Sequence, residues 1–240
     1  RAAEIIDEQK SNGYWEEKSE TQNVPTGETR VGNQVIYNHV TFAKGEDITK
    51  ELFDDDQHGF VEKLVREMAI NGRQTRERQG FATYRNGFNA AFPGGDGVSL
   101  FNAAHPLLSG GTQSNTGTAS LDPDSLFQGI VNLQQQQSQG GVIMGVMPAV
   151  LLVPSALYRL ATQITESRLE ANTADNQMEV YSSKYGLRVM QTPFLGANNP
   201  GGSDTAWFLI GEMHGVTRYE REAITTELVD WKLSRSDSYH

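Results

Sequence analysis

The feature that most constrains this chain is a helical pattern that begins near His58 and continues to about Arg85. Its apolar residues recur at helical spacing at Val61, Leu64, Val65 and Met68. If the helix passes through Gly72, about 27 residues at about 1.5 Å each give a rod of roughly 40 Å. The apolar stripe fades after Ile70 while the charged residues continue. The pattern therefore predicts either a helix longer than the core it covers, typical of an elongated molecule, or simply an exposed helix end.

Charged residues surround this helical segment. Oppositely charged residues four positions apart lie on the face away from the stripe, at Glu62 and Arg66, Lys63 and Glu67, and Arg73 and Glu77. An acidic run at residues 54–56 precedes the helix, where carboxylates complement the unpaired N–H groups and the helix dipole. The same run could ligate a divalent metal, but no second acidic cluster follows to complete a site. We therefore predict a capping role for the run.

The N-terminal part is expected to be the end of a helix followed by an extended loop. Alanine and isoleucine in residues 1–10 indicate the helix end. Residues 13–45 are polar, are interrupted by proline and glycine, and contain a β-type run from Gln34 to Phe42. This composition predicts an extended hairpin with a mobile tip. Because it holds few apolar residues, the hairpin needs a neighbour for stability.

The middle of the chain is predicted to be rich in loops, with one helix. Residues 86–120 contain many Gly, Ser, Thr and Asn residues. Asp122 and Pro123 then have the residue types of an N-cap and a first helical position. The apolar stripe of this helix is Leu126, Ile130 and Leu133. We expect the helix to end in the glutamine-rich run that starts at Gln134 and to be closed by glycine.

The C-terminal half mixes strands and helices. A buried strand is expected over residues 149–153, a turn at Pro154, and then a helix. The residues expected on the inward face of that helix are Leu157, Leu160, Ala161 and Ile164. Further strands are expected over residues 187–190 and 206–210, with a loop at 196–202 and exposed β structure over 223–233. Because the elements show no βαβ regularity and no repeat, the predicted fold class is α+β.

Composition excludes several classes of protein. The chain has 240 residues, a formal net charge of -10 and no cysteine, so it has neither disulfides nor thiolate ligands. A net acidic chain with scattered basic residues is not expected to grip duplex DNA. The longest apolar run, residues 142–153, is interrupted by Gly145 and Pro148, so no membrane span is predicted. The chain opens with Arg-Ala-Ala-Glu and no apolar stretch, so no signal peptide is predicted. The chain starts at Arg1 rather than Met, so its ends are expected to be cleaved or incomplete.

The sequence largely lacks the motifs of known catalytic sites. Gly140 and Gly145 have the spacing of a phosphate-binding loop, but Val146 occupies the lysine position. The histidines, at positions 39, 58, 105, 214 and 240, lack the spacing of metal ligands. We therefore predict no catalytic, cofactor-binding or metal-binding residues and no cofactor. Base stacking by Trp207 or Trp231 is less favoured than packing, because a stacking groove also needs positive charge.

His105 is the strongest catalytic candidate. It precedes Pro106 in a glycine-rich loop region, where functional residues are common. It could act as a general base oriented by Asp96 or Asp122, as in a hydrolase. The favoured interpretation is that its ring nitrogens bond to the backbone of the loop and fix its path.

Several segments in order resemble the major capsid proteins of tailed phages, and most closely the Mu-like major head subunits. They are Tyr37 to Phe42, Asp47 to Asp56, Asp96 to Leu107, Asn115, Leu121 to Leu126, Pro148 to Pro154 and Ala206 to Leu209. The likeness covers roughly residues 35–210. Each segment is a weak pattern by itself, but the set in one order is specific.

This resemblance implies the α+β fold of the Hong Kong 97 phage capsid (HK97-like), with a spine helix, an extended loop, a peripheral domain and an axial domain. The implied boundaries are 1–12 for the end of an N-terminal arm, 13–45 for the extended loop, and 46–120 for the peripheral domain with the spine helix. The axial domain is expected at 121–205, with a return to the peripheral domain at 206–240.

The function implied by the resemblance is that of a non-enzymatic major capsid protein. It would self-assemble as hexamers and pentamers into an icosahedral shell around double-stranded DNA, without sequence-specific binding. Its expected partners are neighbouring capsomers and portal, scaffold and decoration proteins, and its expected place is the virion, after assembly in the bacterial cytoplasm. The alternatives are an encapsulin-type nanocompartment shell and, less favoured, a hydrolase centred on His105.

Overall fold

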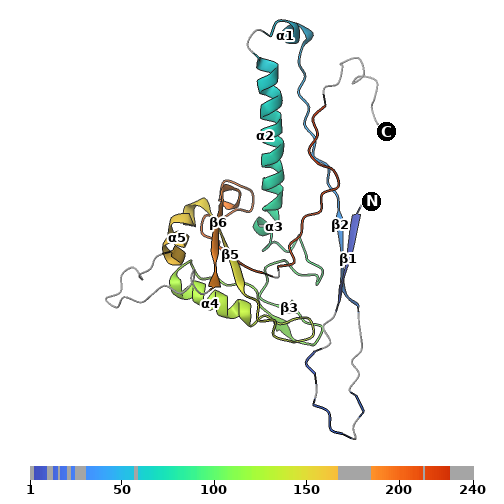
Figure 1. Ribbon diagram of the computed structural model, residues 1–240, viewed down its shortest axis with the longest axis vertical. Coiled ribbons are helices and arrows are strands. Elements are labelled where there is room, and N and C mark those ends of the chain that lie inside the picture. The colour runs from blue at the N-terminus through green and yellow to red at the C-terminus, as the bar shows by residue number, and fades with distance from the viewer. Residues whose placement is uncertain are drawn as a thin grey trace, which may run out of the picture. The chain divides into compact units, whose positions relative to one another are not determined.

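The computed structural model describes residues 3–9, 13–15, 17–20, 23–24, 31–56, 59–166, 185–212 and 214–227, with only the backbone for 3–9 and 31–33. The chain forms two compact units. Unit 1 comprises residues 1–38 and 81–217, and unit 2 comprises residues 39–80 and 218–240. Each unit therefore combines segments that are distant in the sequence. Most of the helices and strands are labelled in Figure 1.

The centre of unit 1 is a three-stranded sheet in the order β6-β5-β7. Strand β5 (Pro148–Pro154) pairs in parallel with β6 (Arg188–Thr192) and antiparallel with β7 (Phe208–Gly211). The expected strands are therefore confirmed, and β5 is the middle strand. Its apolar run is buried because neighbouring strands cover both of its edges and side chains cover both of its faces.

Alternate side chains of β5 enter two different apolar clusters. Leu151 and Val153 belong to the main cluster, which also contains residues of α4 (Pro123–Gln134) and α5 (Tyr158–Glu166). Leu152 belongs to a second cluster with Leu195 and Phe208, and aromatic side chains pack around it. Those aromatic side chains are Phe81, Tyr84 and Phe101. The core of unit 1 thus lies on both faces of one short sheet.

Helix α4 begins as its sequence predicts. The Asp122 carboxylate accepts a hydrogen bond from the Ser125 backbone N–H at 2.8 Å, and the Ser125 hydroxyl accepts one from the Asp122 N–H at 3.0 Å. The predicted glycine closure is wrong, because the helix ends at Gln134 and its C-cap, Gln135, has right-handed helical angles. The following residues instead form a small turn with a β-bridge between Gln137 and Ile143.

Helix α5 follows β5 through the one-turn 3-10 helix η1 (Ser155–Leu157). Ala161 and Ile164 are buried in the main cluster, as predicted, and Leu157 packs against it. The prediction for Leu160 is wrong, because this side chain is 38% exposed and belongs to neither cluster. The helix is short and only one side of it faces the sheet.

The region around residues 86–120 contains turns and two very short strands, β3 (His105–Pro106) and β4 (Thr112–Gln113), which pair antiparallel. This region follows α3 (Ala82–Arg85) in the chain.

The 3-10 helix η2 (Pro193–Leu195) follows β6. Gly202 lies after η2, and a Cβ at this position would meet the carbonyl oxygen of Gly196. Only glycine permits this approach of two backbone segments.

The prediction for residues 1–10 is wrong. Residues Ala3–Gln9 form strand β1, which pairs antiparallel with β2 (Val31–Asn38), and the register aligns Ile5 with Ile36. The hairpin expected within residues 13–45 therefore uses residues 3–9 as its first strand. Strand pairing with a segment about 30 residues away overrides the local helical pattern. Most of the predicted mobile tip lies outside the described residues.

Unit 2 contains the predicted long helix, α2 (Phe60–Gly80), preceded by the short helix α1 (Lys50–Asp54). The N–H groups of Phe60 and Val61 donate to the Asp56 carboxylate at 2.8 and 2.9 Å, so capping by the acidic run is confirmed for Asp56. The helix continues through Gly72 but ends at Gly80, earlier than expected. His58, its expected first residue, lies outside the described residues.

A C-terminal segment packs along α2. Ile224 contacts Gly72, where a Cβ would lie 3.5 Å from its side chain, and Arg76 forms an ion pair with Glu220 at 2.7 Å. Residues 223–227 have no regular secondary structure, so the predicted β structure is wrong there. Residues 228–233 lie outside the described residues. In the part of the chain that is described, no helix is long and apolar enough to cross a membrane.

Candidate functional site

His105 is the residue on which the hypothesis of a general base depends. This residue begins β3, and its Nδ1 lies 2.6 Å from the Oδ2 of Asp96, which sits in the turn before it. The two side chains are only 16% and 14% exposed. The structure therefore brings together His105 and Asp96, one of the two orienting residues considered. Asp122 instead caps α4.

The other ring nitrogen of His105 decides what the pair can do. Its Nε2 is buried and has no hydrogen-bond partner among the described residues. A general base must expose one nitrogen to the substrate while the carboxylate holds the other. The prediction that backbone groups hold both nitrogens is wrong in detail, because a carboxylate holds one. In this geometry the pair connects two turns of the loop region.

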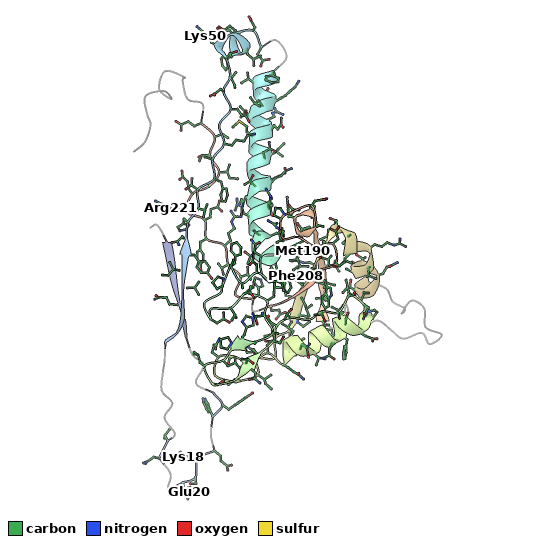
Figure 2. The ribbon with its side chains drawn as sticks, turned by 180° about the vertical axis from the view of Figure 1, so that it is seen from behind. Lys18, Glu20, Lys50, Met190, Phe208 and Arg221 are labelled. Carbon is green, nitrogen blue, oxygen red and sulfur yellow. The ribbon has the colours of Figure 1, made fainter. Side chains whose placement is uncertain are left out.

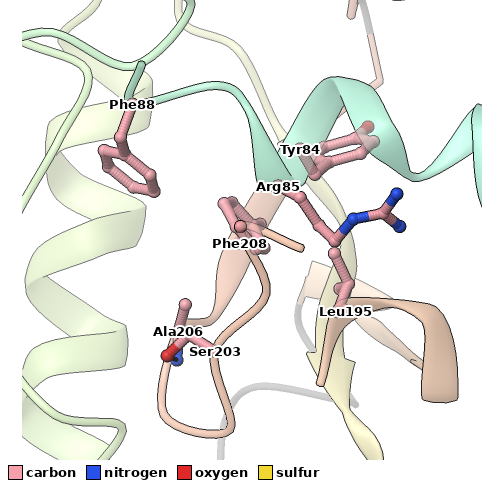
Figure 3. Close-up of a pocket in the computed structure, with 8 residues that line it drawn as sticks. Tyr84, Arg85, Phe88, Leu195, Ser203, Ala206 and Phe208 are labelled. Atoms are coloured by element: carbon pink, nitrogen blue, oxygen red, sulfur yellow. Dashed lines mark hydrogen bonds between the residues drawn. The ribbon is translucent and has the colours of Figure 1, made fainter. Parts of the chain in front are cut away.

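A small cavity of about 250 Å³ lies beside the second cluster (Figure 3). Tyr84, Phe88 and Phe208 form its apolar wall. Arg85 donates to the carbonyl oxygens of Phe194 and Pro200 at 2.8 and 3.2 Å, so its guanidinium braces the loop after η2. Burial raises the pKa of the Tyr84 phenol. The cavity contains apolar and bracing groups rather than an acid–base pair.

A wider groove of about 880 Å³ lies between α4, β7 and residues 112–119. Its lining carries amides, hydroxyls and aromatic rings, and no lysine or arginine. Trp207 does not act as a free stacking platform, because its indole N–H donates to the carbonyl of Ala119 at 3.1 Å and its ring packs against the main cluster. A groove without positive charge does not suit nucleic-acid phosphates. Trp231 lies outside the described residues.

Large apolar side chains remain exposed elsewhere. Helix α2 has no buried residue, and Phe60, Val65 and Ile70 are each nearly half exposed. Trp15 is 99% exposed, next to Tyr14, whose hydroxyl accepts a hydrogen bond from the Ile143 N–H at 3.0 Å. Such exposed apolar surfaces are typical of protein–protein interfaces.

Metal ligation finds no support in the described residues, which contain no group of three His, Asp or Glu side chains that could hold an ion. Sequence reasoning missed two arrangements in unit 2. The first is the contact of Ile224 with Gly72, and the second is the sharing of Glu220 by Arg76 and Arg218, at 2.7 and 3.2 Å. The unexplained glycine inside a helical pattern was the available signal for the first.

Two solved capsid structures have the fold of this chain. The first is the capsid of bacteriophage JBD30 decorated with minor capsid protein trimers, with a TM-score of 0.63 and 15% identity over 82% of this chain and 86% of that one. The second is the bacteriophage JBD30 capsid, with a TM-score of 0.65 and 14% identity over 82% and 87%. No curated protein sequence matches significantly.

The predicted α+β capsid fold is thus confirmed by the similarity to solved capsids. A sequence model of a family described as phage capsid protein matches residues 32–236. That range covers both clusters of unit 1, helix α2 and the C-terminal segment that packs on it. The chain belongs to the phage capsid protein family.

Proposed function

We propose that this chain is the major capsid subunit of a tailed phage and that it builds an icosahedral shell by self-assembly into hexamers and pentamers. The observation that carries the proposal is helix α2, which has 21 residues and fully buries none of them within the chain. A helix of this length gains little stability from propensity alone and depends on packing. Contacts with other copies would supply the missing burial and make the exposed apolar residues part of interfaces.

The domain map implied by the resemblance is part of this proposal. Residues 13–45 would be the extended loop, 46–120 the peripheral domain, 121–205 the axial domain and 206–240 the return to the peripheral domain. The pairing of Arg76 with Glu220 supports such a return, because it joins the C-terminal segment to α2. The β1–β2 pair supports a loop that needs a neighbour, because two isolated strands are marginally stable.

We also propose the partners and the location. The JBD30 capsid carries minor capsid protein trimers, and this shell would likewise take decoration proteins, together with scaffold and portal proteins. It would enclose double-stranded DNA without reading its sequence, which fits a net charge of -10. It would assemble in the cytoplasm of the host bacterium and remain in the virion. The buried Nε2 of His105 supports a structural rather than an enzymatic role.

Negative-stain electron microscopy of the purified chain tests the shell directly. We expect closed particles of uniform diameter, and particles isolated from a phage lysate should contain double-stranded DNA rather than a cargo enzyme. A chain that stays monomeric at every concentration and salt tested would refute self-assembly. A protein cargo in place of DNA would indicate a nanocompartment.

A matched pair of variants tests the role of α2. Val65→Asp places a charge on an exposed apolar position, so we expect normal circular dichroism but no shells. Lys63→Gln makes the same change in net charge at an exposed charged position of the same helix and should still assemble. Equal assembly of the two variants would contradict a role of this apolar surface in the interface.

A further inference from the structure

Unit 2 has an acidic end. From Lys44 to Asp56 there are six carboxylates and two lysines, a formal charge of 2 − 6 = −4. Within this segment, Glu46 pairs with Lys44 at 2.7 Å and Asp56 caps α2. The other four carboxylates are exposed and form no ion pair with any described residue: Asp47, Glu51, Asp54 and Asp55. Leu52 and Phe53 of α1 are exposed among them. We name this segment the acidic end.

The same unit has a basic region farther along α2. Five arginines and three glutamates lie there, a formal charge of 5 − 3 = +2: Arg73, Arg76, Arg78, Arg218, Arg221, Glu77, Glu220 and Glu222. Arg76 and Arg218 share the single carboxylate of Glu220, so positive charge remains in excess. Arg73 is exposed and forms no ion pair with a described residue. We name this set the arginine end.

Helix capping and the helix dipole explain only part of the acidic end. Asp56 alone accepts the first N–H groups of α2. Asp54 is the last residue of α1 and Asp55 is its C-cap, where the dipole disfavours negative charge. Four like charges within nine residues also repel one another. A five-residue helix with no buried residue does not hold such an arrangement by itself.

The two ends cannot neutralise each other within one chain. Arg73 lies 13 residues after Phe60, or about 20 Å along α2. Screening at physiological salt acts over about 8 Å. Figure 2 shows Lys50 at the α1 end of the unit and Arg221 beside α2, well away from it. In a second copy, by contrast, the arginine end offers the positive charge that the acidic end lacks, and the acidic end offers the negative charge that the arginine end lacks.

We propose that the acidic end of one copy docks on the arginine end of unit 2 in a second copy. Charge complementarity would select the partner and its orientation, and Leu52 and Phe53 would supply the apolar contact. Such a head-to-tail contact uses two different patches and closes into rings when its rotation permits. The inference rests on the proposed self-assembly, but its contact can be detected whether or not closed shells form.

Cross-linking between two single-cysteine variants tests the contact, because the natural chain has no cysteine. Asp54→Cys and Arg73→Cys proteins are mixed and treated with a short bis-maleimide. We expect a covalent dimer in the mixture and far less dimer with either variant alone. Asp54→Cys mixed with Glu166→Cys, an exposed position in unit 1, is the control and should give little dimer.

The outcomes separate this contact from shell formation. Dimer in the Asp54→Cys and Arg73→Cys mixture supports the contact even if microscopy shows no shells. An absence of shells would refute the proposed function and not the contact. Shells without that dimer overturn the contact and leave the proposed function standing. Equal dimer with Asp54→Cys alone also overturns it, because the acidic ends would then meet each other.

Charge reversal gives an independent measurement. Replacing Asp54 and Asp55 by lysine should raise the concentration needed for association at least about tenfold, because like charges then face each other. Adding Arg73→Glu and Arg221→Glu to the same chain should recover most of the loss. Glu166→Lys with Glu212→Lys, the matched change in net charge in unit 1, should have little effect. If the quadruple variant associates no better than the double lysine variant, pairing of the two ends is contradicted.

Discussion

Two residues of α5 distinguish the tertiary structure from helical periodicity. Leu160 and Ile164 lie four positions apart, and periodicity alone predicts that both face inward. The structure buries Ile164 to 7% exposure in the main cluster, whereas Leu160 is 38% exposed. Replacing each by alanine therefore tests the packing of α5 with two closely similar changes.

The expected magnitudes follow from burial. Ile164→Ala removes three carbon atoms that are almost fully buried, and at about 0.8 kcal/mol for each this costs about 2.4 kcal/mol. The cavity left behind raises the total to about 3 kcal/mol. Leu160→Ala leaves no enclosed cavity, so its cost should stay below about 1 kcal/mol. Alanine gains more helix propensity over isoleucine than over leucine, which works against the expected difference and makes the test conservative.

The assay is urea unfolding of unassembled subunits, followed by circular dichroism below the concentration at which they associate. With a slope of about 2.5 kcal/mol per molar urea, Ile164→Ala should lower the midpoint by about 1.2 M and Leu160→Ala by less than about 0.4 M. Equal shifts for the two variants would refute the packing of α5 described here.

Three further predictions concern stability. Asp122→Ala removes the capping box of α4 and should destabilise the unassembled subunit by about 1 kcal/mol in the same urea assay, whereas Asp122→Ser should retain most of the stability. Gly202→Ala should cost about 1–3 kcal/mol, because its Cβ would meet the Gly196 carbonyl, while Gly117→Ala, with open space around it, should be nearly neutral in thermal unfolding. Burial raises the pKa of Tyr84, so this phenol loses its proton at a lower pH in the unfolded chain than in the folded one, and stability should fall as the pH rises above about 10. Phenolate absorbance should show a late-titrating tyrosine that Tyr84→Phe removes. Persistence of that late titration in the variant would contradict the assignment.

The elements that were predicted well are those whose signals are local. Asp122 and Pro123 start α4 because a side-chain oxygen next to the first turn satisfies a backbone N–H whatever the rest of the chain does. The apolar run of β5 is long enough for a strand and is bounded by Pro148 and Pro154, so its burial was readable in advance. The charged and apolar periodicity of α2 predicted a long helix for the same reason.

The elements predicted wrongly depend on partners that are distant in sequence. Residues 3–9 form a strand because β2 supplies hydrogen-bond partners about 30 residues away, and nothing within the segment encodes that pairing. Helix α2 ends at Gly80, and Phe81 beyond it packs beside the second cluster instead of extending the helix. Asp96 and Asp122 were both left open as partners of His105, and the turn at residues 94–97 brings the Asp96 carboxylate to the ring.

The sequence by itself determined where the capped helix α4, the periodic helix α2 and the apolar strand β5 lie, that the chain has no cysteine chemistry, and that its ordered motifs resemble those of capsid proteins. Only the tertiary structure decided which side chains are covered and which stay exposed, including the exposed Val65 of α2, the outward Leu160 and the buried Nε2 of His105. The physical reason is that caps and periodicity act within a few residues. Burial, by contrast, depends on which distant segments meet, and that is fixed by the packing of the whole chain.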